Sequence, residues 1–190
     1  KSGTVTEEKK PVTTIAPLLY DLTSLQREAA NRYGFSAKRT LQLAQECYEK
    51  HKVLTYPRTD SRYLPEDYLG KVYGIVGAVA EENAEFAPFA RDILDNKRVK
   101  PNRRVFDTKK VSDHFAIIPT GKIEKLSGDV QKLFEMVMAR FLAVFFPPAV
   151  FEDTRRTTLI DHRDGVTDAF LTTGRVLVEP GWQAVYGRKA

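Results

Sequence analysis

The chain has 190 residues, of which 42% are hydrophobic and 29% are charged, as is typical of a folded protein. Its longest apolar run, around residues 141–146, is far shorter than the ~20 residues of a membrane helix, and its first residues lack the apolar stretch of a signal peptide. The net charge of +5 permits binding to nucleic acid without requiring it, and the single cysteine excludes an internal disulfide.

The chain is predicted to begin extended and then to become helical. Residues 1–20 are polar and contain several β-branched residues, which favours an extended segment. Thr23 and Gln26 have the spacing of a capping box, in which each side chain pairs with a free backbone N–H. Gly34 can adopt the left-handed conformation that ends a helix. The sequence therefore predicts a helix from Thr23 to about Tyr33.

Three further helices follow. Ser36 is a suitable N-cap for a helix that ends near Lys50. Its apolar positions fall largely on one stripe and are Leu41, Leu43, Ala44, Cys47 and Tyr48. Because a tight turn joins it to the preceding helix, the two are predicted to form a helix-turn-helix-like pair. Pro65, followed by two acidic residues, indicates another helix start, and a shorter helix is predicted over residues 89–95.

The second half contains a basic stretch, one long helix and several strands. The clustered cations are Lys97, Arg98, Lys100, Arg103, Arg104, Lys109 and Lys110. Residues 129–146 have apolar side chains at the spacing of a core helix, which two prolines then end. Strands are predicted over residues 154–160, 166–172 and 175–178. These strands could pair with the extended start of the chain or with parts of a larger protein. The fold class is therefore predicted as α+β, with a mainly helical middle flanked by β segments.

The segment Thr-Tyr-Pro-Arg-Thr-Asp-Ser, residues 55–61, has groups suited to attack on a phosphate. Pro57 disfavours a helical conformation at Tyr56. In an extended segment, alternate residues share a side, so Tyr56, Arg58 and Asp60 would point the same way. A tyrosine hydroxyl is protonated at neutral pH and needs charge stabilisation to attack phosphorus. Arg58 can supply it, because its guanidinium binds two phosphate oxygens at once.

The other polar side chains of this segment have supporting roles. The hydroxyls of Thr55, Thr59 and Ser61 could donate to phosphates or brace the loop. Asp60 could orient Arg58 or help to cap the following helix. The local residues leave a second interpretation open, namely a surface turn with one half-buried aromatic ring, since no base or metal ligand can be identified beside the tyrosine.

Several ordered motifs make the sequence similar to the core of bacterial type IA DNA topoisomerases, in particular the topoisomerase III branch. Residues 55–61 resemble a signature of that branch, and residues 22–28 and 36–41 resemble the stretches before it. Asp-His-Phe-Ala-Ile-Ile-Pro-Thr, residues 113–120, and Pro-Gly-Trp-Gln-Ala-Val-Tyr, residues 180–186, resemble further motifs of the family. The resemblance covers nearly the whole chain.

The resemblance implies an ATP-independent enzyme that relaxes or decatenates DNA by passing a strand through a transient single-strand break. By motif position, Tyr56 is the nucleophile that stays joined to the 5′ phosphate, and Arg58 clamps that phosphate. His114 contacts or polarises the scissile phosphate region. Lys38 and Arg39, in an early basic group, are candidate DNA contacts. The supporting residues are Thr55, Thr59, Asp60 and Ser61.

The resemblance also implies a partner domain. In the family an acidic Toprim domain, N-terminal to this region, supplies the ligands of Mg²⁺, and no acidic group of that character is found in this sequence. No metal site is therefore expected in this chain. We expect the chain to be a fragment of a longer enzyme, consistent with the missing initial methionine. That enzyme is expected to be a monomer in the bacterial cytoplasm, associated with the nucleoid, and to act on DNA and not on membranes. Alone, it is expected neither to relax DNA nor to cleave it efficiently.

The family's layout divides the sequence into three parts. Residues 1–19 and 148–190 are expected to belong to the arch domain, and residues 20–147 to form the helical catalytic-tyrosine domain. In the family this domain swings away as a gate after cleavage, with the arch strands as its hinge.

Two other functions agree with parts of the pattern. A non-enzymatic helix-turn-helix module would bind duplex phosphates through the helical pair and the basic stretch, with Tyr56 as a packing residue. Such a module would bind duplex DNA equally well after Tyr56→Phe. A tyrosine recombinase is disfavoured because the sequence lacks an appropriately spaced set of catalytic arginines and histidines.

Overall fold

The computed structural model describes residues 3–190 and divides the chain into two compact units. One unit consists of the chain up to Ala16 together with residues 147–190, and it contains the three strands of the described residues. The other unit, Pro17–Phe146, contains the α-helices.

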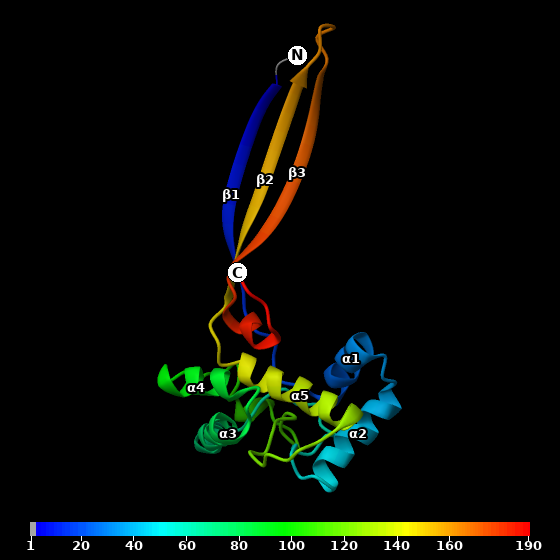
Figure 1. The fold of residues 1–190 in the computed structure, drawn as a ribbon, viewed down its shortest axis with the longest axis vertical. Coiled ribbons are helices and arrows are strands. Elements are labelled where there is room, and N and C mark those ends of the chain that lie inside the picture. Colours follow the sequence, from blue (N-terminus) through cyan, green and yellow to red (C-terminus); the bar gives the residue numbers. More distant parts are fainter. Residues whose placement is uncertain (1–2) are drawn as a thin grey trace. The chain divides into compact units, whose positions relative to one another are not determined.

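The first unit is built on an antiparallel sheet with the strand order β1-β2-β3. The strands are β1 (Gly3–Thr14), β2 (Ala149–Asp161) and β3 (Thr167–Glu179). They lie side by side as long ribbons in Figure 1. The two ends of the sequence therefore pair with each other, as Glu7 opposite Arg156 illustrates. A tight turn joins β2 to β3, where the His162 N–H donates to the Val166 carbonyl at 2.8 Å.

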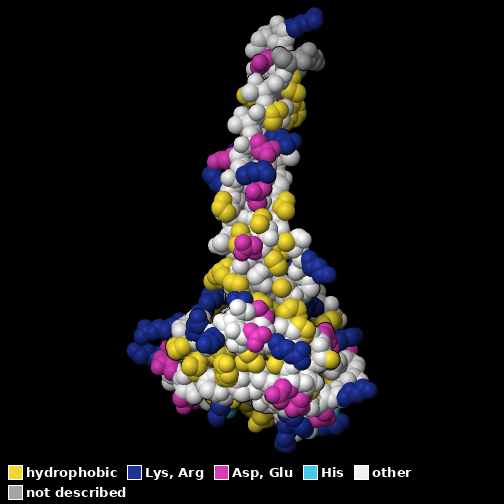
Figure 2. All heavy atoms as spheres, turned by 60° about the vertical axis from the view of Figure 1, so that its left-hand side comes forward, with side chains coloured by type: hydrophobic (Ala, Val, Ile, Leu, Met, Phe, Trp, Pro, Cys, Tyr) yellow, Lys and Arg dark blue, Asp and Glu magenta, His cyan; other side chains and the backbone are white. Residues whose placement is uncertain are grey.

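The sheet exposes large apolar side chains. Phe170 is 53% exposed and Val176 62% exposed. Figure 2 shows hydrophobic side chains between charged ones along the strands. A cross-strand ion pair between Glu7 and Arg156, 2.6 Å, follows the register. Since both partners are exposed to solvent, such a pair contributes little stability by itself.

The third strand is longer than the sequence pattern predicted. Residues 166–172 and 175–178 were predicted as separate strands, but all of these residues except Val166 lie within the single strand β3. The predicted gap is absent because Thr173 pairs with Arg155 and Gly174 pairs with Thr154 in an unbroken register.

A short 3-10 helix, η3 (Gly181–Tyr186), follows the sheet. The Trp182 indole N–H donates to the Thr14 carbonyl at 2.9 Å, which ties η3 to the end of β1. Gly181 has a φ of +49°, and a Cβ at this position would lie 2.3 Å from the Pro148 carbonyl oxygen. Only glycine fits this close approach.

The helical unit begins with the helix-turn-helix-like pair α1 (Leu22–Tyr33) and α2 (Ala37–Glu49). Gly34 ends α1 in the left-handed conformation, with a φ of 68°. Ser36 caps α2, and its hydroxyl accepts from the Arg39 N–H at 3.1 Å. These two boundaries confirm the predictions.

The start of α1 differs from the prediction, because its N-cap is Asp21 and the proposed Thr23–Gln26 capping box is wrong. The Asp21 carboxylate accepts from the Ser24 N–H at 2.8 Å, and the Ser24 hydroxyl accepts from the Asp21 N–H at 3.2 Å. A carboxylate at this position also interacts favourably with the positive end of the helix. Gln26 instead donates to the Ala37 carbonyl at 3.0 Å.

Three more helices complete this unit: α3 (Leu69–Glu82), α4 (Ala87–Asp95) and α5 (Gly128–Ala143). In Figure 1, α5 lies between the α1–α2 pair and the α3–α4 pair. Nearly every side chain of its second half is buried, which makes it the centre of the core. The helix start predicted at Pro65 corresponds to a 3-10 turn, η1 (Glu66–Tyr68), that runs into α3. A second 3-10 turn, η2 (Thr108–Lys110), lies in the basic stretch.

A buried charge on α5 ties it to α1. Arg140 is 6% exposed and forms an ion pair with Glu28. Its guanidinium also donates to the Leu18 carbonyl at 2.9 Å and lies 4.1 Å from the centre of the Tyr20 ring. Because a buried cation is costly without partners, these contacts constrain the packing of α1 on α5.

The fold is α+β, as predicted, with a helical unit that contains a helix-turn-helix-like pair and a three-stranded antiparallel sheet in the described residues. Among residues 3–190, every helix is too short or too polar to cross a lipid bilayer.

Candidate active site

A short antiparallel pairing positions the segment that carries Tyr56. Leu54 forms an isolated bridge with Pro119. The Thr55 N–H donates to the Ile118 carbonyl at 3.0 Å, and the Thr120 N–H donates to the Val53 carbonyl at 3.0 Å. Thr55 and Ile118 are 63 positions apart in the sequence. The chain between α2 and η1 is therefore fixed against a distant segment.

The Thr55 side chain extends this pairing. Its hydroxyl donates to the Ala116 carbonyl at 3.0 Å and accepts from the Ile118 N–H at 2.9 Å. Ala116 and Ile118 are fully buried, so these backbone groups depend on protein partners. The hydroxyl of Thr55 therefore braces the site and is occupied by protein partners.

Burial alternates along the tyrosine segment. Pro57, Thr59 and Ser61 are buried, whereas Arg58 and Asp60 are exposed. This period of two is that of an extended chain, as the proline predicted. Tyr56, half-buried, continues the exposed series.

The two buried hydroxyls join the tyrosine segment to the segment that contains His114. Thr59 donates to the His114 carbonyl at 3.0 Å and accepts from the Ser61 N–H at 3.1 Å. The Ser61 hydroxyl donates to the Lys110 carbonyl at 2.8 Å. Thr59 and Ser61 therefore act as structural braces, one of the two roles that the sequence left open for them.

The Tyr56 ring lies between two other rings. Its centroid is 4.2 Å from that of His114, with an interplanar angle of 38°. The ring of Tyr48, on α2, contacts the Tyr56 ring edge to face, with the two centroids 5.4 Å apart. Rings in such arrangements attract one another, which restricts the orientation of the central phenol. The structure thus brings together Tyr56 and His114, two of the three predicted catalytic residues.

Arg58 is exposed and makes no hydrogen bond or ion pair with any residue in the part of the chain that the structure describes. It lies two residues from Tyr56 on the same side of the extended segment. A permanently charged guanidinium in this position is available to an anion from solution.

Asp60 has a different partner from those considered for it. Its carboxylate accepts from the Ser112 hydroxyl at 2.7 Å. It neither orients Arg58 nor caps the following helix, because η1 has Pro65 as its N-cap residue and no side-chain cap. Its contact with Ser112 instead adds another link to the segment before His114.

Lys38 and Arg39 lie apart from the tyrosine segment. Both are exposed and stand at the start of α2. Lys38 is ten residues before Tyr48 and Arg39 is nine, which corresponds to roughly 14–15 Å along the helix axis. Arg39 forms an ion pair with Asp129 at the start of α5, 3.1 Å. This pair links two helices, so Arg39 is partly committed to a structural contact.

Sequence reasoning missed two neighbours of the site. Tyr48 was assigned to the apolar stripe of α2, but its side chain is 38% exposed and contacts Tyr56. Lys110, at the end of the basic stretch, lies with its ammonium 4.6 Å from the centre of the Tyr63 ring. The helical spacing of Tyr48 indicated a buried position, and no local signal distinguishes a ring that packs on a distant loop.

The site offers little to a metal ion. Among the described residues, no group of three or more His, Cys, Asp or Glu side chains could hold one. Cys47, on α2, is buried, and burial raises the pKa of its thiol to about 12. It therefore behaves as a core residue and not as a thiolate ligand.

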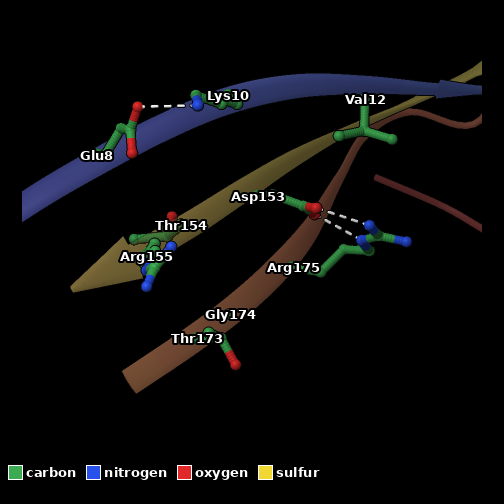
Figure 3. A pocket seen from close by; sticks show the side chains of 9 residues that line it. All are labelled: Glu8, Lys10, Val12, Asp153, Thr154, Arg155, Thr173, Gly174 and Arg175. Atoms are coloured by element: carbon green, nitrogen blue, oxygen red, sulfur yellow. Dashed lines mark hydrogen bonds and ion pairs between the residues drawn. The ribbon is translucent and has the colours of Figure 1, made fainter. Parts of the chain in front are cut away.

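A cavity of about 520 Å³ lies on the sheet of the other unit, and Figure 3 shows the residues that line it. Asp153 and Arg175 form two hydrogen bonds of 2.5 and 2.6 Å, and Glu8 pairs with Lys10 at 3.0 Å. The Arg175 guanidinium lowers the pKa of Asp153. Because most of its charged groups already pair with each other, we do not assign the chemistry to this cavity.

Comparison with known proteins gives consistent matches over the whole chain. A family model described as DNA topoisomerase matches residues 1–190. The DNA topoisomerase 3 of Bacillus cereus (strain ATCC 14579) is 41% identical over 190 residues, which cover 98% of this chain and 25% of the relative. The DNA topoisomerase 3 of Bacillus subtilis (strain 168) is 40% identical over 192 residues, with the same shares of 98% and 25%.

The fold also matches a solved structure. Full-length topoisomerase I from Thermotoga maritima superposes with a TM-score of 0.65 and 25% sequence identity, over 97% of this chain and 29% of that one. The chain spans about a quarter of the length of the curated relatives that it matches.

Proposed function

This chain belongs to the DNA topoisomerase family, and on that premise we propose that it supplies the catalytic tyrosine of a type IA enzyme. The proposed enzyme cuts one DNA strand through a 5′-phosphotyrosine intermediate, passes a strand through the break and reseals it. It relaxes negatively supercoiled DNA or separates catenated DNA, and it acts on a single-stranded segment. No observation on this chain favours a non-enzymatic DNA-binding module.

In the proposed reaction, the Tyr56 hydroxyl oxygen attacks a backbone phosphorus. A bond forms between this oxygen and phosphorus, the bond from phosphorus to the 3′ oxygen breaks, and the 3′ oxygen receives a proton in place of the one that the phenol loses. The reverse step restores the strand. Because the phosphodiester is exchanged for a phosphotyrosine of similar bond type, resealing needs no ATP.

The observation that carries this proposal is the packing of the Tyr56 ring on the His114 ring, 4.2 Å between centroids. It unites two motifs that are distant in the sequence. Arg58, exposed on the same side of the segment, provides the cation that a phosphate undergoing attack requires. We therefore assign Tyr56 as nucleophile, Arg58 as phosphate clamp and His114 as a contact that polarises the phosphate.

Lys38 and Arg39 are proposed as more distant DNA contacts, with Arg39 shared between DNA and Asp129. Thr55, Thr59 and Ser61 brace the segment through their hydroxyls, each of which bonds to a backbone group. Their contribution to the reaction is therefore to hold Tyr56 in place.

We propose that Mg²⁺ acts in the complete enzyme, held by acidic residues of a Toprim domain outside this chain. The residues around Tyr56 do not themselves fit a divalent cation, because Arg58 repels one and the nearby Asp60 carboxylate is bound to Ser112. Mg²⁺ would neutralise charge on the DNA phosphates when that domain is present. The chain by itself is accordingly expected to bind DNA without cutting it efficiently.

The division of labour along the chain is also a proposal. Residues 20–147 would form the catalytic-tyrosine domain, and residues 1–19 and 148–190 would belong to the arch domain. We further propose that the complete enzyme is a monomer in the bacterial cytoplasm, where it associates with the nucleoid.

A chimera tests the proposal directly. Residues 1–190 replace the matching segment of Bacillus cereus DNA topoisomerase 3, and the chimera is incubated with a single-stranded oligonucleotide and Mg²⁺ before denaturation. A label at the 3′ end of the DNA should migrate with the protein, whereas a label at the 5′ end should appear on a shorter free strand. Tyr56→Phe should abolish both products, while Tyr63→Phe, two residues beyond the tyrosine segment, should retain them. Survival of the adduct in Tyr56→Phe would refute the assignment.

A further inference from the structure

A cavity of about 360 Å³ opens beside the tyrosine segment, lined by Tyr48, Glu49, Lys52, Leu54 and Thr120. We propose that it holds the first nucleotide of the cleaved strand, the one whose 5′ phosphate is joined to Tyr56. Its base would stack on Tyr48, and the phosphate that follows it would contact Lys52. This inference rests on the proposed function.

Tyr48 shows that the cavity lies next to Tyr56. The ring of this residue lines the cavity and also contacts the Tyr56 ring, at a centroid distance of 5.4 Å. A phosphotyrosine carries its strand with it, so the nucleotide bonded to that phosphate must occupy space next to the Tyr56 ring. The cavity supplies such space within the same helical unit.

Tyr48 has the surface that a base needs. Its side chain is 38% exposed, although the helical stripe to which it belongs is otherwise turned to the core. The contact with Tyr56 is edge to face, with an interplanar angle of 78°, so the two rings are not stacked face against face. Bases of any sequence stack on such a ring, and its loss weakens binding by about 5- to 150-fold.

Hydrogen bonds fix the backbone at Lys52. It has a φ of +56°, a conformation that residues other than glycine adopt only when their surroundings impose it. The Lys52 carbonyl accepts from the Thr120 hydroxyl at 2.7 Å, and the preceding His51 carbonyl accepts from the Lys122 ammonium at 2.9 Å. The Lys52 ammonium itself has no partner in the part of the chain that the structure describes, which leaves it available to a phosphate.

Glu49 sets the orientation of the ligand. Its exposed carboxylate also lines the cavity and repels a phosphate on its side. The phosphate therefore belongs at Lys52 and the uncharged base at the tyrosine. This arrangement predicts opposite effects for two neutralising substitutions, because Lys52→Gln should weaken binding and Glu49→Gln should strengthen it.

The test uses the 190-residue chain and a thymidine trinucleotide that carries a 5′ phosphate and a 3′ fluorophore. Anisotropy at low salt gives the Kd without any need for cleavage. Tyr48→Ala should raise the Kd by about 5- to 150-fold, and Tyr48→Phe should leave it within about twofold. The matched control is Tyr73→Ala on α3, a tyrosine that is 48% exposed and does not line the cavity. Normal binding by Tyr48→Ala, or an equal loss in Tyr73→Ala, would overturn the proposal.

A second variant tests the phosphate contact and does not disturb a packed ring. Replacing the first internucleotide phosphate with an uncharged methylphosphonate should weaken binding to the parent chain and leave binding to Lys52→Gln unchanged. Lys125→Gln, which removes an exposed lysine outside the cavity, should respond to the methylphosphonate as the parent does. An equal methylphosphonate effect in Lys52→Gln and the parent would refute the contact.

The outcome is distinguishable from failure of the proposed function. If the chimera forms its adduct at Tyr56 but Tyr48→Ala binds the trinucleotide normally, only the cavity assignment is wrong. If the Tyr56→Phe chimera still forms the adduct, the proposed function is wrong whatever the trinucleotide does.

Discussion

Replacing Thr55 with valine tests whether its hydroxyl holds the tyrosine segment in place. Valine keeps the shape of threonine and removes both hydrogen bonds, to the Ala116 carbonyl and from the Ile118 N–H. An unsatisfied buried polar group costs about 1–3 kcal/mol. Two such groups, partly relieved by water because position 55 is half-buried, should lower the stability by about 2–4 kcal/mol. At about 2–4 °C per kcal/mol, Tm should fall by about 5–15 °C.

Circular dichroism at a helical wavelength measures this change in the helical unit. Thr23→Val on α1 is the matched control, since Thr23 is exposed and threonine and valine have similar helix propensities. In the chimera, the same Thr55→Val change should reduce adduct formation at least about tenfold at temperatures below Tm, because the tyrosine is no longer fixed beside His114. A Tm within about 1 °C of the parent would refute the brace and the positional argument built on it.

The remaining predictions concern charge and reactivity. In the chimera, Arg58→Gln should slow adduct formation by about 10²–10³-fold without changing Tm, because its side chain is exposed and unpaired within the described residues; a normal rate would contradict its role. His114→Ala should slow the same step by about 10²–10³-fold, and loss of its ring contact with Tyr56 should lower Tm by only about 1–6 °C; an unchanged rate would remove it from the site. Burial raises the pKa of Cys47 to about 12, so a disulfide reagent at pH 8 should label it only after denaturation, and rapid labelling of the native chain would contradict its burial. Arg175 lowers the pKa of Asp153, so their pair stabilises the sheet above the titration range of a free aspartate and is lost as the pH falls through the lowered pKa. The Tm difference between the parent and Arg175→Gln should therefore vanish in strong acid, and a constant difference would show that the pair is not responsible.

Local sequence signals predicted much of the secondary structure. The stop at Gly34 and the cap at Ser36 were correct because each depends on one residue's conformational preference. The cap of α1 was wrong because several residues near Asp21 could serve, and the choice depends on where the helix meets the rest of the unit. The third strand was split in the prediction because Gly174 has low strand propensity, which pairing with Thr154 overrides.

The candidate site shows the same limit. The alternation that turns Tyr56 and Arg58 outward follows from local sequence, because Pro57 imposes an extended backbone. The partners of the buried hydroxyls do not follow from it. They lie on a segment that the fold brings back from residues 110–118, and only tertiary structure defines that approach. For the same reason Tyr48, which spacing assigned to the core, was not recognised as a neighbour of Tyr56.

Peptide mapping identifies the residue that becomes joined to DNA, which we expect to be Tyr56. The chimera is trapped on a single-stranded oligonucleotide, digested with nuclease and trypsin, and analysed by mass spectrometry. Trypsin cuts after Lys52 and Arg58, so residues 53–58 form one peptide in which Tyr56 is the only tyrosine. We predict that this peptide carries the nucleotide mass, on the phenol and through a 5′ phosphate. A nucleotide found on any other peptide, or attached through a 3′ phosphate, would show that Tyr56 is not the nucleophile of a 5′-phosphotyrosine reaction.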